Sequence, residues 1–213
     1  MLTPEALTLS HWLSPAFPTG AFAYSHGLEQ VIARGDVADA TGLEHWLSEM
    51  LRFGTGWQDA VLLSMGLQDK ADLDALDALS IALQPCSERL QESQEQGFAF
   101  ARIVGQTTGR ELTPRSLPLA VAEAAAALSL PRAFVIALYL QAFLTNLVTI
   151  AIRHIPLGQG DGHAVLARLL PLLPEIARDA ESAQTPDAFG NSCFAADLAA
   201  MEHETKEVRL FRT

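Results

Sequence analysis

Thr41-Gly-Leu-Glu-His-Trp-Leu-Ser-Glu-Met-Leu51 is the stretch of sequence that decides the fold class. Its large apolar side chains recur at i, i+3, i+4, i+7 and i+8, which places them on one face of an α-helix: Leu43, Trp46, Leu47, Met50 and Leu51. Thr41 followed by Glu44 has the form of a capping box and predicts that the helix begins there. The stretch therefore predicts an amphipathic helix that buries one face against other helices.

Helical patterns continue on both sides of this stretch, and no alternation of period two indicates a β-strand. Hydrophobic residues make up 49% of the 213 residues but aromatic residues only 7%, which favours helices packed on helices. We predict an all-α, single-domain bundle of about eight to ten helices over residues 1–200, followed by a tail at 201–213. Further helices are expected near residues 3–13, 25–34, 57–66, 70–83, 87–106, 117–130, 133–152, 162–183 and 193–201.

Gly97 lies in the middle of the helix predicted from Ser87 to Gln106. Glycine in a helix interior costs about 1 kcal/mol relative to alanine. A close approach of another helix would explain it, and so would chance; the sequence leaves both explanations open.

The run from Ala133 to Ile152 contains twenty residues without a charge, which is long enough to span a bilayer. Gln141, Thr145 and Thr149 share one side of this run. Arginines at 132 and 153 flank it without the asymmetry that would orient a membrane span. We prefer a buried core helix over a membrane helix.

Charge and cysteine content exclude several classes of protein. The net charge is −11 and the chain has two lysines, so it lacks the basic face of a nucleic-acid-binding protein. Cys86 and Cys193 are isolated and form neither a disulfide framework nor a zinc motif. Residues 1–12 do not have the form of a signal peptide. We expect a cytoplasmic protein without a membrane segment.

Ser14-Pro-Ala-Phe-Pro-Thr-Gly-Ala-Phe-Ala-Tyr-Ser-His-Gly-Leu-Glu29 is the most unusual segment of the chain. Its prolines fix φ, and its glycines permit backbone angles that other residues resist. We expect a shaped segment that is pinned to the body of the protein by its aromatic side chains: Phe17, Phe22 and Tyr24.

The sequence does not indicate an enzyme. Ser25 and His26 are adjacent, but neighbours in a helix point in different directions, and there is no GxSxG motif. His203 lies between Glu202 and Glu204, a weak metal pattern for which solvated charge is the preferred interpretation. The loop at 158–162 lacks the lysine and preceding strand of a phosphate-binding loop. We predict no catalytic residues, metal site or cofactor, and keep a hydrolase using Ser25 and His26 as the alternative.

Arg209-Leu-Phe-Arg212 has two apolar side chains flanked by basic ones, as in a peptide that docks into an acidic-rimmed groove. Disorder is the competing interpretation of such a terminal segment.

Three segments together resemble the UreF family of urease accessory proteins. They are residues 14–29, the stretch from Asn146-Leu-Val through Arg153 to Pro156-Leu-Gly-Gln-Gly-Asp-Gly162, and His203-Glu204 with the final Arg209-Leu-Phe-Arg212. Their order and spacing extend along most of the chain. Ala21 and Ala23 depart from the family pattern, which usually has a glycine and a serine there.

The resemblance implies a non-catalytic, all-helical homodimer that acts as a chaperone in metallocentre assembly. It would bridge a UreD-type (UreH-type) accessory protein and the UreG-type GTPase, so that nickel is inserted into apo-urease. It assigns the tail to docking on the UreD-type partner. From the three segments we expect the following residues to bind partners: Tyr24, His26, Glu29, Arg153, Gln159, Asp161, Arg209, Leu210, Phe211 and Arg212.

Overall fold

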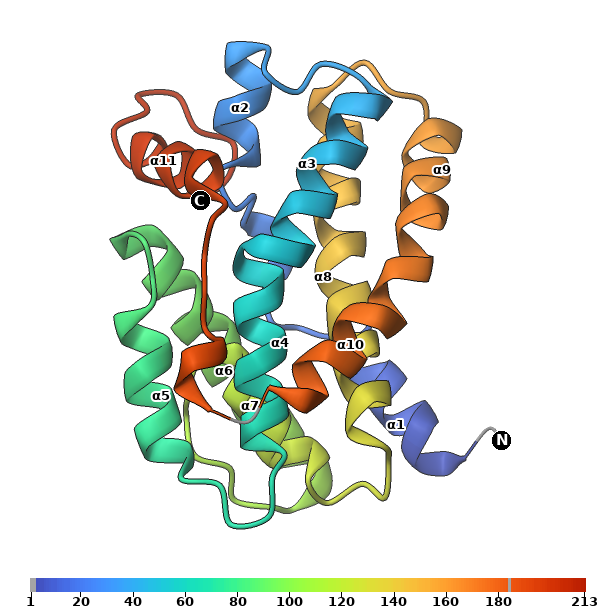
Figure 1. Ribbon diagram of the computed structural model, residues 1–213, viewed down its shortest axis with the longest axis vertical. Coiled ribbons are helices and arrows are strands. Elements are labelled where there is room, and N and C mark those ends of the chain that lie inside the picture. The colour runs from blue at the N-terminus through green and yellow to red at the C-terminus, as the bar shows by residue number, and fades with distance from the viewer. Residues whose placement is uncertain (1–2, 184) are drawn as a thin grey trace.

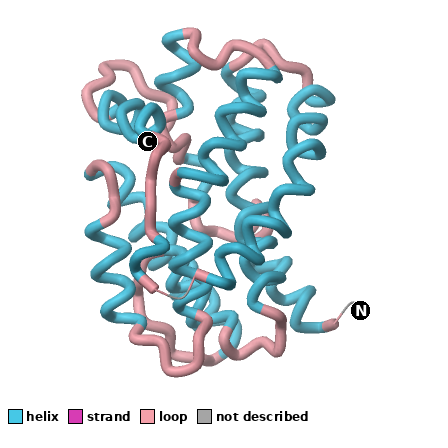
Figure 2. Tube along the Cα trace, in the orientation of Figure 1, coloured by secondary structure: helices cyan, strands magenta, loops and turns pink. Residues whose placement is uncertain are grey.

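The computed structural model describes residues 3–183 and 185–213. These residues fold into α-helices joined by loops and short 3-10 turns, without a strand among them (Figures 1 and 2). The predicted all-α class is confirmed. The α-helices are α1 Pro4–Trp12, α2 Leu28–Arg34, α3 Ala40–Phe53, α4 Thr55–Gly66, α5 Leu73–Ala82, α6 Ser87–Thr108, α7 Leu117–Ala125, α8 Arg132–His154, α9 Gln159–Leu169, α10 Leu173–Ser182 and α11 Phe194–His203. The 3-10 turns are η1 Ala21–Ala23, η2 Leu170–Leu172 and η3 Pro186–Ala188.

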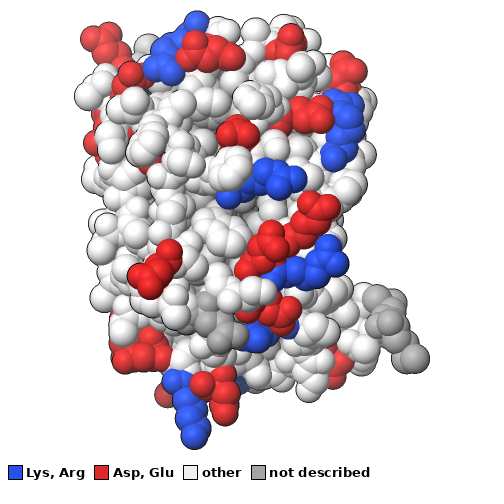
Figure 3. All heavy atoms as spheres, in the orientation of Figure 1, with Lys and Arg blue, Asp and Glu red and all other residues white. Residues whose placement is uncertain are grey.

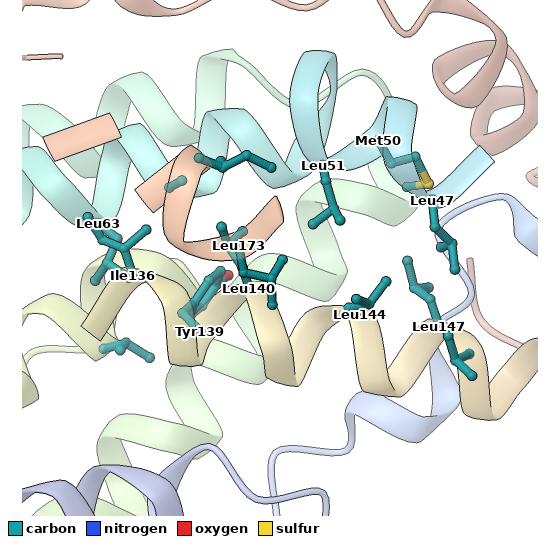
Figure 4. Close-up of a cluster of buried hydrophobic side chains, with 14 of the residues drawn as sticks. Leu47, Met50, Leu51, Leu63, Ile136, Tyr139, Leu140, Leu144, Leu147 and Leu173 are labelled. Carbon is teal, nitrogen blue, oxygen red and sulfur yellow. The ribbon is translucent and has the colours of Figure 1, made fainter. Parts of the chain in front are cut away.

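Helix α8 is the central element of the core. It packs against α2, α3, α4, α9 and α10, and α4 also packs against a second group formed by α5 and α7. Figure 4 shows side chains of α8 pointing toward those of α3 and α10. Its length and composition would allow a membrane span, but half of its most apolar window is buried by neighbouring helices. This packing supports the core-helix interpretation.

Helix α3 has the predicted apolar face, but it begins earlier than the capping box predicted. Leu43, Leu47, Met50 and Leu51 are buried in the core. The N-cap is Asp39, whose carboxylate accepts a hydrogen bond from the backbone N–H of Gly42 at 2.8 Å. An N-cap at Thr41 was therefore wrong, because an aspartate two residues earlier caps the same first turn.

Gly97 is required by a close backbone approach. A Cβ atom at this position would lie 2.0 Å from the carbonyl oxygen of Arg115 and 2.7 Å from the backbone nitrogen of Leu117. The loop that leads into α7 thus crosses directly over α6, and the two helices pack together. A close approach explains Gly97, but it is made by a loop backbone and not by a helix.

The segment from Ser14 to Glu29 does not continue into α2 as early as predicted. His26 has φ 55° and Gly27 has φ 74°, both left-handed, so α2 begins at Leu28 and not at Ser25. A Cβ atom at Gly27 would lie 2.8 Å from the backbone nitrogen of Ala200, which shows how closely α11 approaches. The left-handed turn at 26–27 therefore makes room for α11.

Two of the three aromatic anchors of this segment are confirmed. Phe17 and Tyr24 are buried, and the Phe17 ring packs at an angle of 53° against Phe100 of α6, with ring centroids 5.6 Å apart. Phe22 was wrongly expected to be an anchor, since it is 67% exposed on η1. The carbonyls of Ala21 and Tyr24 are held by the amide of Asn146 on α8, which turns Phe22 outward.

The C-terminal segment returns to α2 and α11. Helix α11 extends to His203, three residues into the predicted tail, and packs on α2 and α6. Figure 1 shows the C-terminus beside α11, on the side of the molecule away from α1. On the face drawn in Figure 3, acidic and basic side chains are interspersed with uncharged surface.

Candidate functional site

Three glutamates of α6 form a row beneath the C-terminal segment. Glu88, Glu92 and Glu95 lie at i, i+4 and i+7, so they project from one side of the helix. Each carboxylate binds a residue at the end of the chain, and a fourth carboxylate, Glu29 of α2, faces the same segment. These four carboxylates and the segment 209–213 that they hold are called the tail site below.

Glu92 is the buried centre of the row. Its carboxylate forms an ion pair with Arg89, lies 2.7 Å from Nε2 of His26, and accepts a hydrogen bond from Oγ1 of Thr213 at 3.0 Å. Burial alone would raise the pKa of Glu92, but the charge of Arg89 and the hydrogen bonds from His26 and Arg89 lower it to about 2. Burial and the charge of Arg89 lower the pKa of His26, whose Nε2 also lies 3.2 Å from Nη1 of Arg89.

Glu95 joins the exposed end of the row to Tyr24 and Arg212. Nη1 of Arg212 donates to Oε2 of Glu95 at 2.6 Å and to the hydroxyl of Tyr24 at 3.1 Å. The Tyr24 hydroxyl donates to the same carboxylate, and the guanidinium lies 5.9 Å from the Tyr24 ring centroid. Burial and the Glu95 hydrogen bond raise the pKa of Tyr24 to about 12, so the phenol remains a donor.

Glu29 fixes the backbone of the tail. Its carboxylate accepts hydrogen bonds from the backbone N–H groups of Leu210 at 3.1 Å and Phe211 at 3.0 Å. Nε2 of His203 lies 3.2 Å from the same carboxylate. Burial would raise the pKa of Glu29, but these three hydrogen bonds lower it below its ordinary value. Glu29 is therefore an ionised acceptor that orders the residues on both sides of the tail.

The end of the tail is bonded to the backbone of the Ser14–Glu29 segment. The backbone N–H of Ser25 donates to the carbonyl oxygen of Thr213 at 2.9 Å, and the N–H of Arg212 donates to the carbonyl of Ala23 at 2.8 Å. Phe211 is buried against the His154 ring, with centroids 4.8 Å apart. Residues almost two hundred positions apart thus form one structural unit.

The outer side of the tail site is exposed and apolar. Val208 is 76% exposed and Leu210 72% exposed, although the neighbouring Phe211 is buried. Helix α11 adds an exposed apolar stripe at i, i+4 and i+7, formed by Phe194, Leu198 and Met201. The buried alanines of this helix lie on its opposite side, toward the body of the protein. The C-terminal part of the chain therefore combines a buried anchoring side with an outward apolar side.

The structure brings together seven of the ten residues expected to bind partners: Tyr24, His26, Glu29, Arg209, Leu210, Phe211 and Arg212. Arg153 lies instead at a cavity. Asp161 accepts a hydrogen bond from the N–H of Gly158 at 3.3 Å, so it caps α9 from inside the helix and not from before Gly162 as predicted. Among the described residues, no hydrogen bond or ion pair joins Gln159 or Asp161 to the tail.

Glu88, Glu92, Glu95 and the role of His203 were not predicted from the sequence. His203 was interpreted as solvated charge, which is wrong, because its side chain is fully buried between Glu29 and Glu88. The available signal was the spacing of three glutamates on one face of α6 together with an N-terminal half too polar for a core helix. Where the chain is described, no group of three or more His, Cys, Asp or Glu has a metal-binding arrangement.

Ser25 and His26 do not form a nucleophile and base. The side chain of Ser25 is buried, and its Oγ donates to the carbonyl oxygen of Thr213. Among the described residues, no hydrogen bond joins Ser25 to the His26 ring. Nε2 of His26 is bound by Glu92. The geometry therefore gives the hydrolase alternative no support.

A cavity of about 250 Å³ lies beside the tail site. Aromatic rings of the Ser14–Glu29 segment and α8 line it, and charged groups form its floor: Phe17, Phe22, Phe143, Asp59, Arg89 and Glu92. The Tyr139 hydroxyl donates to Asp59 at 2.6 Å, but burial raises the pKa of Asp59 to about 6. The cavity is thus amphipathic, with a titratable carboxyl group in its wall.

Comparison with known proteins gives consistent matches along the chain. The UreF family model matches residues 37–170. The chain is 55% identical to the urease accessory protein UreF of Cereibacter sphaeroides (strain ATCC 17025), over 97% of this chain and 98% of the relative. It is 48% identical to that of Paracoccus denitrificans (strain Pd 1222), over 100% and 99%. It is 42% identical to that of Jannaschia sp. (strain CCS1), over 99% and 96%.

Proposed function

Because the chain belongs to the UreF family of urease accessory proteins, we propose that it acts in urease maturation as a non-catalytic scaffold. In this role it bridges a UreD-type accessory protein and a UreG-type GTPase while nickel, the cargo, is inserted into apo-urease. The active form proposed is a homodimer. The UreD-type protein, the GTPase and apo-urease are the proposed partners.

The observation that carries this proposal is the two-sided tail site. Phe211 and Thr213 are buried, which anchors the end of the chain, while Leu210 projects outward between Arg209 and Arg212. An exposed leucine flanked by two partly exposed arginine side chains, which Glu88 and Glu95 hold in place, suits a partner groove with an apolar floor. Order in the free protein also lowers the entropy cost of docking.

The expected partner-binding residues have two proposed roles. Leu210, Arg209 and Arg212 contact the UreD-type partner. Tyr24, His26, Glu29 and Phe211 position them from below. Arg153, Gln159 and Asp161 are exposed and remain candidates for other partner contacts.

A single substitution tests the docking role without removing the anchor. We expect Leu210→Asp to abolish co-purification with the UreD-type protein and activation in a reconstituted urease assay. The effect on folding should be within about 0.5 kcal/mol, because the side chain is an exposed one. The matched control is Leu7→Asp on α1, where the leucine is 54% exposed.

Two outcomes would contradict the proposal. Normal co-purification of Leu210→Asp would exclude the tail as the docking element. Substrate turnover by the purified protein alone would exclude the non-catalytic role. Light scattering of the complex measures whether the scaffold is dimeric.

A further inference from the structure

His203 occupies the point where α2, α6, α11 and the tail meet. Its side chain is completely buried. Nδ1 lies 2.8 Å from Oε2 of Glu88, and Nε2 lies 3.2 Å from Oε2 of Glu29. Both ring nitrogens therefore face carboxylate oxygens from different helices.

This arrangement determines the protonation state of the ring. A neutral imidazole has one N–H group and one lone pair, so one of the two contacts would oppose a lone pair to a carboxylate. An imidazolium donates at both nitrogens and also supplies positive charge to a buried site. Two carboxylates inside a protein are costly unless they are paired with positive charge.

The surrounding charges agree with a cationic ring. Glu29 on α2 and Glu88 on α6 are the carboxylates that contact it, and Arg209 of the tail binds the other oxygen of Glu88. Glu204, just beyond α11, accepts hydrogen bonds from Ser87 and from the N–H of Glu88. With His203 protonated, two positive groups balance the two carboxylates that hold the tail.

The ring also controls the acceptor that binds the tail backbone. Oε2 of Glu29 faces His203 and at the same time accepts the N–H groups of Phe211 and Leu210. In the neutral tautomer that carries its proton on Nδ1, the lone pair of Nε2 would face Oε2 of Glu29 and would repel that carboxylate. The backbone N–H groups of Leu210 and Phe211 would then lose their acceptor, and this part of the tail would be held less tightly.

We propose that His203 is held as an imidazolium between Glu29 and Glu88, and that this charged clasp locks residues 209–213 in the docked form. The charged ring joins Glu29 of α2 to Glu88 of α6, and through these two carboxylates it holds the tail. The consequence of the clasp for partner binding rests on the proposed function of Leu210. The existence of the clasp does not depend on that function.

Ring ¹⁵N NMR tests the charge state in the intact protein. In histidine-labelled protein near neutral pH, His203 should show both ring nitrogens in the protonated range, and the signal should be absent from His203→Gln. A neutral tautomer in protein whose tail is docked would overturn the proposal.

Hydrogen exchange tests the mechanical role. In His203→Gln, protection of the Leu210 and Phe211 amides should fall by about tenfold or more, while amides of α8 keep their protection. His163→Gln is the matched control, since His163 is exposed on α9. Unchanged tail protection in His203→Gln would overturn the clasp.

The two proposals fail separately. If Leu210→Asp still binds the UreD-type protein, the docking role fails and the exchange result stands. If His203→Gln keeps its tail protection, the clasp fails although Leu210 can still be the docking residue. Should His203→Gln not fold, the ring ¹⁵N measurement on the unsubstituted protein decides the matter.

Discussion

The core around α8 and the tail site hold their parts together in different ways. In α8 the buried side chains are uncharged, with Leu140 and Leu144 completely inaccessible, and they are fixed by shape and area. In the tail site and its immediate contacts the buried groups are mainly ionic or hydrogen-bonding, such as Glu92 and its neighbours Arg89 and His203. Apolar packing tolerates small adjustments, whereas a buried charge requires its particular partner. The core is therefore held together mainly by shape and buried area, and the tail site by specific buried charge pairs.

The largest effect is expected from removing a charge at the centre of the tail site. Glu92→Gln keeps the size of the side chain but leaves the Arg89 guanidinium without its carboxylate. Breaking a buried pair in this way costs about 3–5 kcal/mol, so the free energy of unfolding should fall by about that amount. Urea denaturation followed by circular dichroism measures it.

Glu95→Gln is the matched control on the same helix. The Glu95 side chain is 40% exposed, and exposed ion pairs contribute less than about 1 kcal/mol. If both variants lost the same free energy of unfolding, burial would not determine how much each glutamate contributes to stability. The contrast between the tail site and α8 would then no longer hold.

A cavity in the core should cost slightly less and leave the tail in place. Leu144→Ala removes three carbon atoms from a completely buried site on α8, for which a loss of about 3 kcal/mol is typical. Local protection of the Leu210 and Phe211 amides should remain, because no charge has changed. Hydrogen exchange would contradict this separation if Leu144→Ala released the tail while α8 stayed protected.

Asp59 connects the two regions, because it bonds Tyr139 of α8 and lines the cavity beside Glu92. Burial raises the pKa of Asp59 to about 6, from an ordinary value of 3.8. Its contribution to stability is therefore full below the unfolded value and is lost as pH rises through about 6. Relative to the unsubstituted protein, Asp59→Asn should gain about 2 kcal/mol between pH 4 and pH 7.

Denaturation at several pH values checks this smallest effect. The quantity compared is the free energy of unfolding of Asp59→Asn and of the unsubstituted protein. If their difference did not vary with pH, the Asp59 carboxyl group would not have the raised pKa.

Much of the fold could be predicted because apolar periodicity is local. The faces of α3 and α8 are present in consecutive residues, and their burial follows from the hydrophobic effect. The errors arose where a distant contact competed with a local signal. Helix α2 starts late because α11 approaches Gly27, and Phe22 is exposed because Asn146 holds the backbone around it.

The candidate site could be predicted in part. The Ser14–Glu29 segment and the C-terminal Arg209–Arg212 were singled out, and the structure places them together. The glutamates of α6 were missed, because three acidic residues on one helix face resemble a solvated surface when their partners are unknown. Those partners lie more than one hundred residues away, at His203, Arg209, Arg212 and Thr213.

The sequence by itself determined the helical class, the preference for a buried core helix at residues 133–152 and the resemblance to a family, because each depends on residue types and spacings along the chain. Only the tertiary structure decided that His203 is buried between two carboxylates, that Phe211 faces inward and that Leu210 faces outward. The physical reason is that hydrophobic periodicity can be recognised within the few turns of a single helix. A buried ion pair, by contrast, is defined only when two distant segments meet and exclude water from their charges.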